Sequence, residues 1–395
     1  MSASRQPEPF QPEQGHPLAA GTSDHPRIDL DRFLVAGPRR VRLVTPTFDP
    51  EPIGTPLYAG ELARWLKATG WEVDVVTNQP HYPRCRRYEG YGRRRRRDMV
   101  DGIPVYRLPT LVPSKGTFGR RALSDLNFLV QGLLASRRLG RSPLTIVISP
   151  GVPFGVPLGR GLTAAGGTLV VWVHDLQSGV AAAVGASSGL VRVSAALERR
   201  CLNRADHVLT LSEGMSRRVR KLGVDRPTRS IFPLWSTLSP DDGVRPDLVA
   251  DVQYSGNIGR KQGCEQLLEL AEGLEARRPG TTLLIRADAV ARRALELDAS
   301  DRGLSNVLFT DLASRADLRK ALQAARVHVI PQVAGVGDSV LPSKMINALA
   351  AGCQLVAAGE PGCAVAELAI RNPNMILTTP GDVEGLTDAV LALLG

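Results

Sequence analysis

Short apolar runs alternate along the chain with longer stretches in which apolar residues recur every three or four positions. The short runs predict buried strands, and the longer amphipathic stretches predict helices. In the first half the predicted strands are 39–47, 71–77, 105–108, 144–148, 168–173 and 207–211, and the predicted helices are 58–70, 123–139 and 190–205. This alternation is typical of βαβ units, which build a parallel sheet.

A segment rich in Pro, Ser and Asp interrupts the pattern at residues 236–246 and predicts a linker. Beyond it, the predicted strands are 251–254, 282–286, 306–310, 327–331 and 354–358, and the predicted helices are 264–276, 316–325, 345–351 and 383–394. The predicted fold class is therefore α/β, with two Rossmann-like doubly wound parallel-sheet domains, 39–235 and 247–395, facing a cleft. Ligands of such sheets bind outside the carboxyl ends of the strands, so the cleft is the expected site.

Composition sets limits on the remaining sequence. Residues 1–38 are rich in Pro, Gln, Ser and acidic residues, which predicts a disordered tail. No apolar run approaches the roughly 20 residues of a membrane span, and the start of the chain has no signal-peptide pattern. The five cysteines form no C-x-x-C pair, which argues against a disulfide framework or a zinc site and favours a cytoplasmic protein.

The net charge of +10 and the pI of about 9.8 favour anionic partners. Nucleic acid is not predicted as a partner, because aromatic residues are only 5% of the chain and no basic stretch is interleaved with them. An arginine run at 93–97 and a basic, partly amphipathic segment at 118–141 fit an anionic membrane surface. The alternative is a solvated surface that serves only solubility.

Two glycine-containing loops follow predicted strands. In SGNIGRKQG (255–263), Gly256 lets the backbone approach a phosphate, and Arg260 and Lys261 would neutralise a diphosphate. In DPEPIGTPLY (49–58), Gly54 opens a helix whose backbone N–H groups could reach a phosphate from the other side. The alternative for each is a plain loop between a strand and a helix.

His174 and Asp175 follow the strand of VWVHDLQ. His174 could donate to a sugar hydroxyl or a developing charge, and Asp175 could orient it or accept a proton. The alternative is a purely structural pair.

GVGDSVLPSKMINALAAG (335–352) leads into a predicted helix. Ser343 is a good N-cap residue, whereas Lys344 in the first turn opposes the helix dipole. A lysine suits this position better if an anion also binds there. Asp338 and Ser339 on the preceding loop could reach hydroxyl groups.

Together these motifs resemble glycosyltransferase family 4, and within it the colanic-acid/exopolysaccharide-type transferases. The matching stretches are FDPEPIGTPLYAGELARWLKATGWEVDVVTNQPHYP (48–83), VHDLQ (173–177), LSEGM (211–215), YSGNIGRKQG (254–263) and LPSKMINALAAG (341–352). The resemblance covers residues 40–395. It implies the two-domain GT-B fold and a retaining, hexosyltransferase-type reaction.

The resemblance also implies roles for single residues. Gly54 would face the donor diphosphate, His174 would lie near the donor sugar, and Arg260 and Lys261 would bind the diphosphate and stabilise its charge as the glycosidic bond breaks. Cationic side chains and a helix N-terminus would then stabilise the negative charge of the leaving diphosphate, as a metal ion does in other enzymes. No metal or cofactor is expected, and the nucleotide-diphosphate sugar is a co-substrate.

The sequence departs from the family pattern at one motif. Most members carry two glutamates with seven residues between them, and those positions are Ser339 and Asn347 here. Asn347 can still bind a ribose hydroxyl, without charge, and the neighbouring Asp338 is the candidate to supply the missing carboxylate.

These observations predict transfer of a sugar from a nucleotide-diphosphate sugar to a saccharide acceptor, lipid-linked, in polysaccharide biosynthesis. The arginine-rich first domain predicts a peripheral position on the inner face of the cell membrane. A sugar-nucleotide epimerase of GT-B type and a catalytically reduced pseudo-glycosyltransferase are the alternatives.

Overall fold

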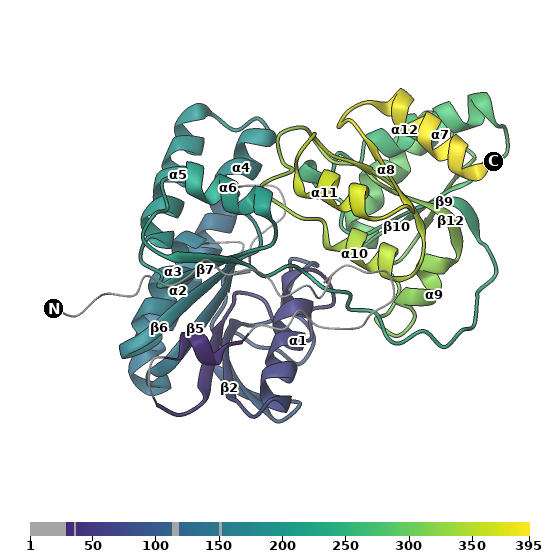
Figure 1. Cartoon of the computed structure of the whole chain (residues 1–395). Helices are drawn as coiled ribbons and strands as arrows, with labels where there is room; N and C mark the ends of the chain where they lie inside the picture. Colours follow the sequence, from purple (N-terminus) through teal and green to yellow (C-terminus); the bar gives the residue numbers. More distant parts are fainter. Residues whose placement is uncertain (1–28, 35–36, 113–117, 150–151) are drawn as a thin grey trace.

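Parallel strands form the centre of each of two α/β domains (Figure 1). The computed structural model describes residues 29–34, 37–112, 118–149 and 152–395. The predicted tail therefore lies mostly outside the described residues. Its end does not: Leu30 and Phe33 are buried in the first domain, and a 3-10 turn spans Asp31–Phe33. The prediction of disorder up to residue 38 was wrong there, because two apolar side chains fill a gap in the core.

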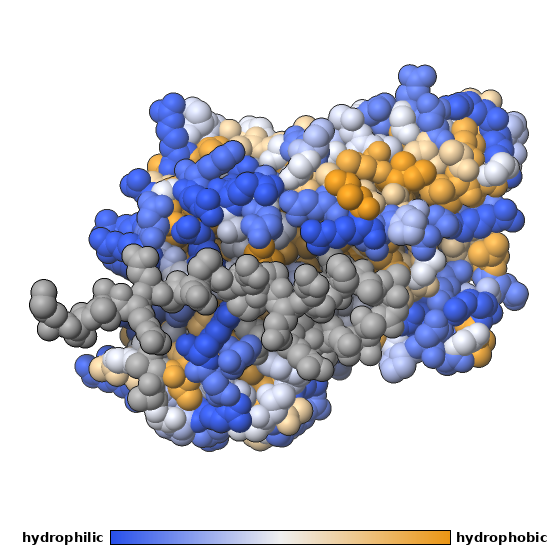
Figure 2. Space-filling model, in the orientation of Figure 1, coloured by the Kyte–Doolittle hydropathy of each residue, from blue (hydrophilic) through white to orange (hydrophobic). Residues whose placement is uncertain are grey.

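The N-terminal domain contains an eight-stranded sheet in the order β3-β4-β2-β1-β5-β6-β7-β8. Its strands are β1 (Arg40–Val44), β2 (Glu72–Asn78), β3 (Arg96–Val100), β4 (Ile103–Leu108), β5 (Ser142–Ser149), β6 (Thr163–Val173), β7 (His207–Thr210) and β8 (Thr228–Ile231). Its helices are α1 (Thr55–Ala68), α2 (Phe118–Leu139), α3 (Val152–Leu162), α4 (Gln177–Ala183), α5 (Ser188–Leu202) and α6 (Glu213–Lys221). On the face shown in Figure 2, hydrophilic side chains gather over α5 and α6.

The C-terminal domain contains a six-stranded parallel sheet in the order β11-β10-β9-β12-β13-β14. Its strands are β9 (Ala250–Ser255), β10 (Leu283–Arg286), β11 (Val307–Thr310), β12 (Ala325–Ile330), β13 (Gln354–Ala358) and β14 (Met375–Thr378). Its helices are α7 (Gln266–Arg277), α8 (Ala289–Asp301), α9 (Leu318–Gln323), α10 (Ser343–Ala350), α11 (Ala364–Arg371) and α12 (Val383–Leu394), with a 3-10 turn, η2, at Arg260–Gln262.

The strand order reverses once in each sheet. In the first sheet the chain moves outward from β1 and then returns to β5 on the other side, and in the second it does the same between β9 and β12. Ligands of doubly wound sheets bind at such switch points, outside the carboxyl ends of the strands. The loops that follow β1 and β9 are therefore the places where binding is expected. These are the two glycine-containing loops identified from the sequence.

Several elements depart from the sequence prediction. Part of the arginine run, predicted as a loop or a membrane-facing segment, forms β3, which pairs antiparallel with β4 at the sheet edge. An edge strand with one exposed face needs few apolar residues, so periodicity did not reveal it. The helix α3 was missed because Pro157 lies inside it.

A buried ion pair ties the first sheet to α2. Arg42 on β1 donates from Nε and Nη2 to the two carboxylate oxygens of Asp74 on β2, at 2.5 and 2.8 Å. It also donates to the backbone carbonyl oxygens of Leu139 and Gly140, at 2.9 and 2.7 Å. Both carbonyls lie at the C-terminal end of α2, where the last C=O groups of a helix have no donor within the helix. The Arg42 guanidinium supplies donors to these two. One side chain thus satisfies both a buried carboxylate and a helix end.

Replacing Arg42 by Leu should destabilise the protein by about 3–5 kcal/mol, because it leaves the Asp74 carboxylate buried without its cation. Equilibrium urea unfolding, followed by tryptophan fluorescence, measures the change. The double variant Arg42→Leu/Asp74→Leu is the control and should recover part of the loss. A single variant as stable as the unmodified chain would contradict the role given to this pair.

Candidate active site

The loops at the carboxyl ends of the two sheets contact each other. Asp175, directly after β6, forms an antiparallel bridge with Val340 on the loop between β12 and α10. The backbone N–H of Leu176 donates to the carbonyl oxygen of Ser339 at 2.9 Å. We call the region where these loops meet the interdomain site. It brings together the stretches 173–177 and 335–342, which the sequence analysis identified as two separate candidate stretches for binding.

Gly54 begins α1 in a conformation that only glycine adopts easily. Its φ is +74°, and it occupies the N-cap position of this 14-residue helix. Thr55 follows, and its Oγ1 lies 3.4 Å from Nδ1 of His174. The α1 N-terminus, with its unpaired N–H groups, therefore lies next to the candidate histidine.

His174 is buried beside aromatic rings. Its ring centroid lies 4.3 Å from that of Trp172 and 6.0 Å from that of Tyr58. Burial lowers the pKa of His174 to about 4, so the ring is neutral at pH 7. Among the described residues its Nε2 has no hydrogen-bond partner. A neutral ring with one free nitrogen can bind a sugar hydroxyl, but it carries no charge of its own.

Asp175 pairs with Lys261 across the domain boundary. The lysine Nζ donates to Oδ2 of Asp175 at 2.9 Å, and both side chains are only partly exposed. The guanidinium of Arg260 donates to the carbonyl oxygen of Val184 at 3.2 Å, and Val184 lies in the N-terminal domain, as Asp175 does. Both predicted diphosphate ligands thus extend from η2 to the N-terminal domain. Among the described residues no hydrogen bond joins Asp175 to His174, and the predicted orienting role of Asp175 stays a prediction.

Lys344 turns away from its own helix and toward β9. Its Nζ donates to the hydroxyl of Tyr254 at 2.7 Å and lies 4.0 Å from the ring centroid. A Cβ at Gly256, whose φ is +149°, would lie 3.4 Å from the lysine stem, so the glycine makes room for it. Burial lowers the pKa of Lys344 to about 8. This ammonium is held between the α10 N-terminus and the loop after β9.

Ser343 does not cap α10. Pro342 occupies the N-cap position in an extended conformation, Ser343 is the first helical residue, and no side chain caps the helix. The predicted N-cap was wrong because the chain turns one residue earlier. Among the described residues, the N–H of Met345 donates to the carbonyl oxygen of Pro342 at 3.1 Å, whereas no side chain caps the helix. The N–H groups at the very start of α10 therefore remain able to bind an anion.

Asp338 and Ser339 pack against two glycines of the N-terminal domain. A Cβ at Gly214 would lie 2.0 Å from Oδ1 of Asp338, and one at Gly179 would lie 2.0 Å from Oγ of Ser339. Among the described residues, both of these buried oxygens lack a hydrogen-bond partner. The structure therefore places both predicted residues at the interdomain site, with unused hydrogen-bonding capacity.

Asn347 binds the linker between the domains. Its Oδ1 accepts from the backbone N–H of Thr237 at 2.9 Å, and its Nδ2 donates to the hydroxyl of that residue at 3.1 Å. The hydroxyl of Ser236 lies 3.4 Å from the same Oδ1. No pattern in the sequence predicts this contact, which joins α10 to a segment 110 residues away. The predicted ribose contact stays a prediction.

Sequence reasoning missed Glu51 and Arg218. Glu51 accepts from the backbone N–H groups of Phe48, His81 and Tyr82 at 2.7–2.9 Å, and so joins the loops after β1 and β2. Burial raises the pKa of Glu51 to about 7. The position of Glu51 between two prolines was the only signal.

Arg218 on α6 lies beside Gly179, where a Cβ would be 2.6 Å from a guanidinium nitrogen, and its buried Nε has no partner in the described part of the chain. Within the sequence it reads as one of several surface arginines of a basic helix. Its closeness to Ser339 appears only in the fold.

Solved structures define the class of this fold. The sucrose-phosphate synthase of Thermosynechococcus elongatus superimposes with a TM-score of 0.71, at 19% identity, covering 90% of this chain and 89% of that one. Anabaena Alr3699/HepE, in complex with UDP-glucose, superimposes with a TM-score of 0.57, at 16% identity, over 89% of each chain. The fold is that of the two-domain GT-B glycosyltransferases, as the sequence predicted.

Sequence comparison identifies the family. The chain matches the Glycosyl transferase 4-like domain over residues 54–235 and the Glycosyl transferases group 1 over residues 250–395. It is 30% identical over 371 residues to WcaI of Escherichia coli (strain K12), a glycosyl transferase named for colanic acid biosynthesis, and the match covers 87% of this chain and 89% of that protein. The chain belongs to glycosyltransferase family 4. The resemblance inferred from the motifs is confirmed.

The low pKa of His174 predicts a loss of stability in acid. A histidine that stays neutral until about pH 4 when folded, but titrates near 6.5 when unfolded, stabilises the fold above pH 6.5 and loses that contribution as the pH falls. Between about pH 7.5 and about pH 5 the loss from this residue should be about 2 kcal/mol.

Urea unfolding of His174→Asn at both pH values tests this expectation. The variant should lose less stability on acidification than the unmodified chain does. His328→Asn is the matched control, because burial lowers the pKa of His328 to about 4 as well. If His174→Asn keeps the full pH dependence while His328→Asn reduces it, the neutral, buried state of His174 is contradicted.

Proposed function

We propose that this protein is a retaining glycosyltransferase that moves a sugar from a nucleotide-diphosphate sugar to a lipid-linked saccharide during polysaccharide biosynthesis. The observation that carries the proposal is the meeting of cationic side chains and helix N-termini at the interdomain site. Lys261 and Arg260 reach it from η2, and the α1 N-terminus borders it from the other domain, beside His174. Lys344 is held nearby, on Tyr254 of β9. The similarity to a structure in complex with UDP-glucose supports the donor class.

In this proposal the donor diphosphate takes the place of Asp175 on Lys261. The carboxylate and a phosphate oxygen are both acceptors for the same ammonium, so Asp175 holds the site in a charge-balanced state until the donor arrives. Arg260 and the α1 N-terminus would add further donors. Positive charge fixed in place before the reaction stabilises the diphosphate as it leaves.

The chemical step breaks the bond between the sugar C1 and the diphosphate oxygen and forms a bond from C1 to the acceptor oxygen. The proton of the acceptor hydroxyl passes to an oxygen of the departing diphosphate. His174, neutral and with a free Nε2, would bind a donor-sugar hydroxyl or the acceptor rather than supply charge. Retention of configuration rests on the family resemblance.

A second candidate, a catalytically reduced pseudo-glycosyltransferase, draws on one observation. The position where relatives carry a ribose-binding glutamate is Asn347, and this side chain is already engaged with the linker. If the side chain at position 347 holds the linker and does not contact the ribose, the protein would bind the donor less tightly. The epimerase alternative finds no comparable support in the described residues.

Incubation of the purified chain with labelled UDP- and GDP-sugars tests the proposal. Transfer or hydrolysis of one donor is expected, and Lys261→Ala should lower its turnover by roughly 10²–10³-fold, the usual cost of losing one preorganised donor. Lys320→Ala is the control, because Lys320 pairs with Asp242 outside the interdomain site and should leave turnover unchanged.

Unchanged turnover in Lys261→Ala would contradict the diphosphate assignment. Interconversion of free sugar nucleotides would indicate the epimerase instead. Tight donor binding with no turnover of any donor would indicate the pseudo-glycosyltransferase.

The proposed peripheral membrane position rests on α2. Its exposed apolar residues are Leu123, Leu126, Val130, Leu133 and Leu134. The arginine run lies beside this helix, since the guanidinium of Arg95 is 3.5 Å from the side-chain oxygen of Gln131. Apolar side chains flanked by arginines suit the interface of an anionic bilayer. Among the helices of the described residues, none is both long and apolar enough to cross a membrane.

Replacing exposed Leu134 by Gln should weaken binding to vesicles that contain anionic lipid, because less apolar surface enters the interface. Co-sedimentation at low salt measures the bound fraction, which should also fall as salt is added. Ile370→Gln on α11 is the matched control, since Ile370 is even more exposed but lies on the other domain. Equal losses in both variants, or no binding at low salt, would contradict an α2 interface.

A further inference from the structure

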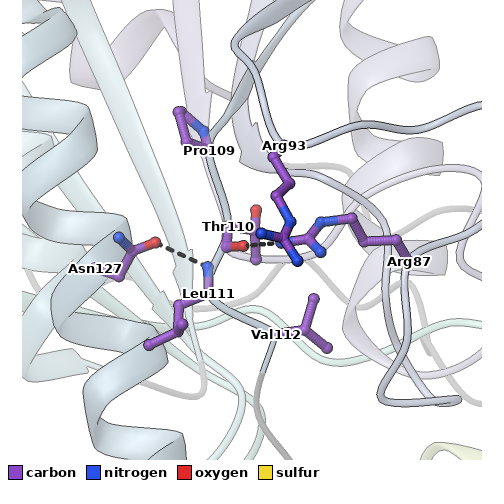
Figure 3. A pocket seen from close by; sticks show the side chains of 7 residues that line it. All are labelled: Arg87, Arg93, Pro109, Thr110, Leu111, Val112 and Asn127. Carbon is purple, nitrogen blue, oxygen red and sulfur yellow. Dashed lines mark hydrogen bonds between the residues drawn. The ribbon is translucent and has the colours of Figure 1, made fainter.

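A pocket of about 420 Å³ lies in the N-terminal domain, outside the interdomain site (Figure 3). Its wall is formed by the segment after β4 (residues 109–112), by Asn127 of α2, and by two arginines, Arg87 and Arg93. The volume falls in the usual range for small-molecule sites. Figure 3 shows both arginine side chains reaching Thr110 from one side and Asn127 facing Leu111 from the other.

The two arginines bring positive charge that no described residue neutralises. Within the described part of the chain, neither Arg87 nor Arg93 forms an ion pair. Arg87 has one hydrogen bond, from Nη2 to the carbonyl oxygen of Thr110 at 2.6 Å, and its buried Nε has no partner in the same residues. Two other arginines of the run have partners outside the pocket. Arg96 forms an ion pair with Asp98, and the Arg97 guanidinium lies over the ring of Tyr106.

The remaining polar groups of the pocket also favour an anion. Oδ1 of Asn127 accepts from the backbone N–H of Leu111 at 3.0 Å, which turns its amide NH₂ group away from that bond and leaves it free to donate. The hydroxyl of Thr110 is already used, since it donates to the carbonyl oxygen of Leu108 and accepts from the N–H of Gln79. The groups left over are therefore donors, and none of the described residues that line the pocket carries a carboxylate.

The position of the pocket relates it to the proposed reaction. It opens at the carboxyl end of β4, on the same edge of the parallel sheet as His174 after β6. Four strand spacings separate β4 from β6, which is about 19 Å at the usual distance between strands. An anion here would lie well away from the donor diphosphate, on the side of the N-terminal domain.

An exposed apolar stripe leads to the pocket. Asn127 shares one face of α2 with Leu123, Val130 and Leu134, which are four residues before it and three and seven residues after it. Leu111, on the pocket wall, is exposed as well. A ligand with an anionic group in the pocket could thus lay an apolar chain along this stripe.

We propose that this pocket binds the phosphate or diphosphate group of the lipid-linked acceptor, with its lipid chain along the exposed face of α2. The proposal rests on the proposed glycosyltransferase function and specifies its acceptor chemistry. Arg87 and Arg93 would bind the phosphate oxygens, and Asn127 would add a neutral donor.

Binding of farnesyl diphosphate to the full chain tests the proposal, with inorganic pyrophosphate and vesicles of phosphatidylglycerol as comparison probes. Each of Arg87→Gln and Arg93→Gln should weaken farnesyl diphosphate binding about tenfold, the typical cost of one charge-assisted hydrogen bond. Arg93→Gln is the cleaner variant, because the Arg93 side chain has no hydrogen bond or ion pair with any other described residue. Arg94→Gln is the matched control: it removes the same charge from the same run but lies outside the pocket.

Pyrophosphate should compete with farnesyl diphosphate, with lower affinity, if the pocket recognises the diphosphate and the stripe recognises the chain. If Arg94→Gln weakens binding as much as Arg93→Gln does, only the overall charge matters and the pocket assignment is overturned. The same holds if the pocket variants affect phosphatidylglycerol vesicles and farnesyl diphosphate equally, because a bilayer surface then explains both.

UDP and GDP binding, measured in parallel, separates this inference from the proposed function. The pocket variants should leave nucleotide binding unchanged. If no donor is turned over while farnesyl diphosphate still binds in an Arg93-dependent way, the reaction has been misassigned but the anion pocket stands. If a donor is turned over and farnesyl diphosphate does not bind, the pocket assignment alone is overturned.

Discussion

The ion pair between Asp175 and Lys261 joins the two domains, because it links the loop after β6 of the first sheet to the switch-point loop after β9 of the second. Its two groups are only partly exposed, so neither is fully screened by water, and each needs an opposite charge. The bridge between Asp175 and Val340 holds the same loop from the other side. In the proposed reaction a donor diphosphate exchanges with a carboxylate that already occupies its place, and Lys261 is never left without an anion.

The linker fixes how the two domains approach each other. Trp235 at its start stacks on Trp172 with ring centroids 5.6 Å apart, and its Nε1 donates to Glu61 on α1 at 2.6 Å. Asn347 binds the next residues of the linker from α10. This segment of the chain is therefore packed against both domains.

Periodicity and glycine placement were enough to predict the parallel sheets and the loops after β1 and β9, because both follow from local backbone requirements. They did not predict which groups the polar ends of long side chains contact. Lys344 was expected to face an anion at its own helix start, yet it lies on Tyr254, and Asn347 contacts the linker. The pocket at Arg93 was hidden for the same reason: five arginines look alike in sequence, and only the pairing of β3 with β4 separates them.

A structure with a bound nucleoside diphosphate is the most direct test of the central claim. The account predicts that the diphosphate lies between η2 and the α1 N-terminus, with Lys261 Nζ within hydrogen-bond distance of a phosphate oxygen and no longer bonded to Asp175. A nucleotide bound elsewhere, with the Asp175–Lys261 pair intact, would contradict it.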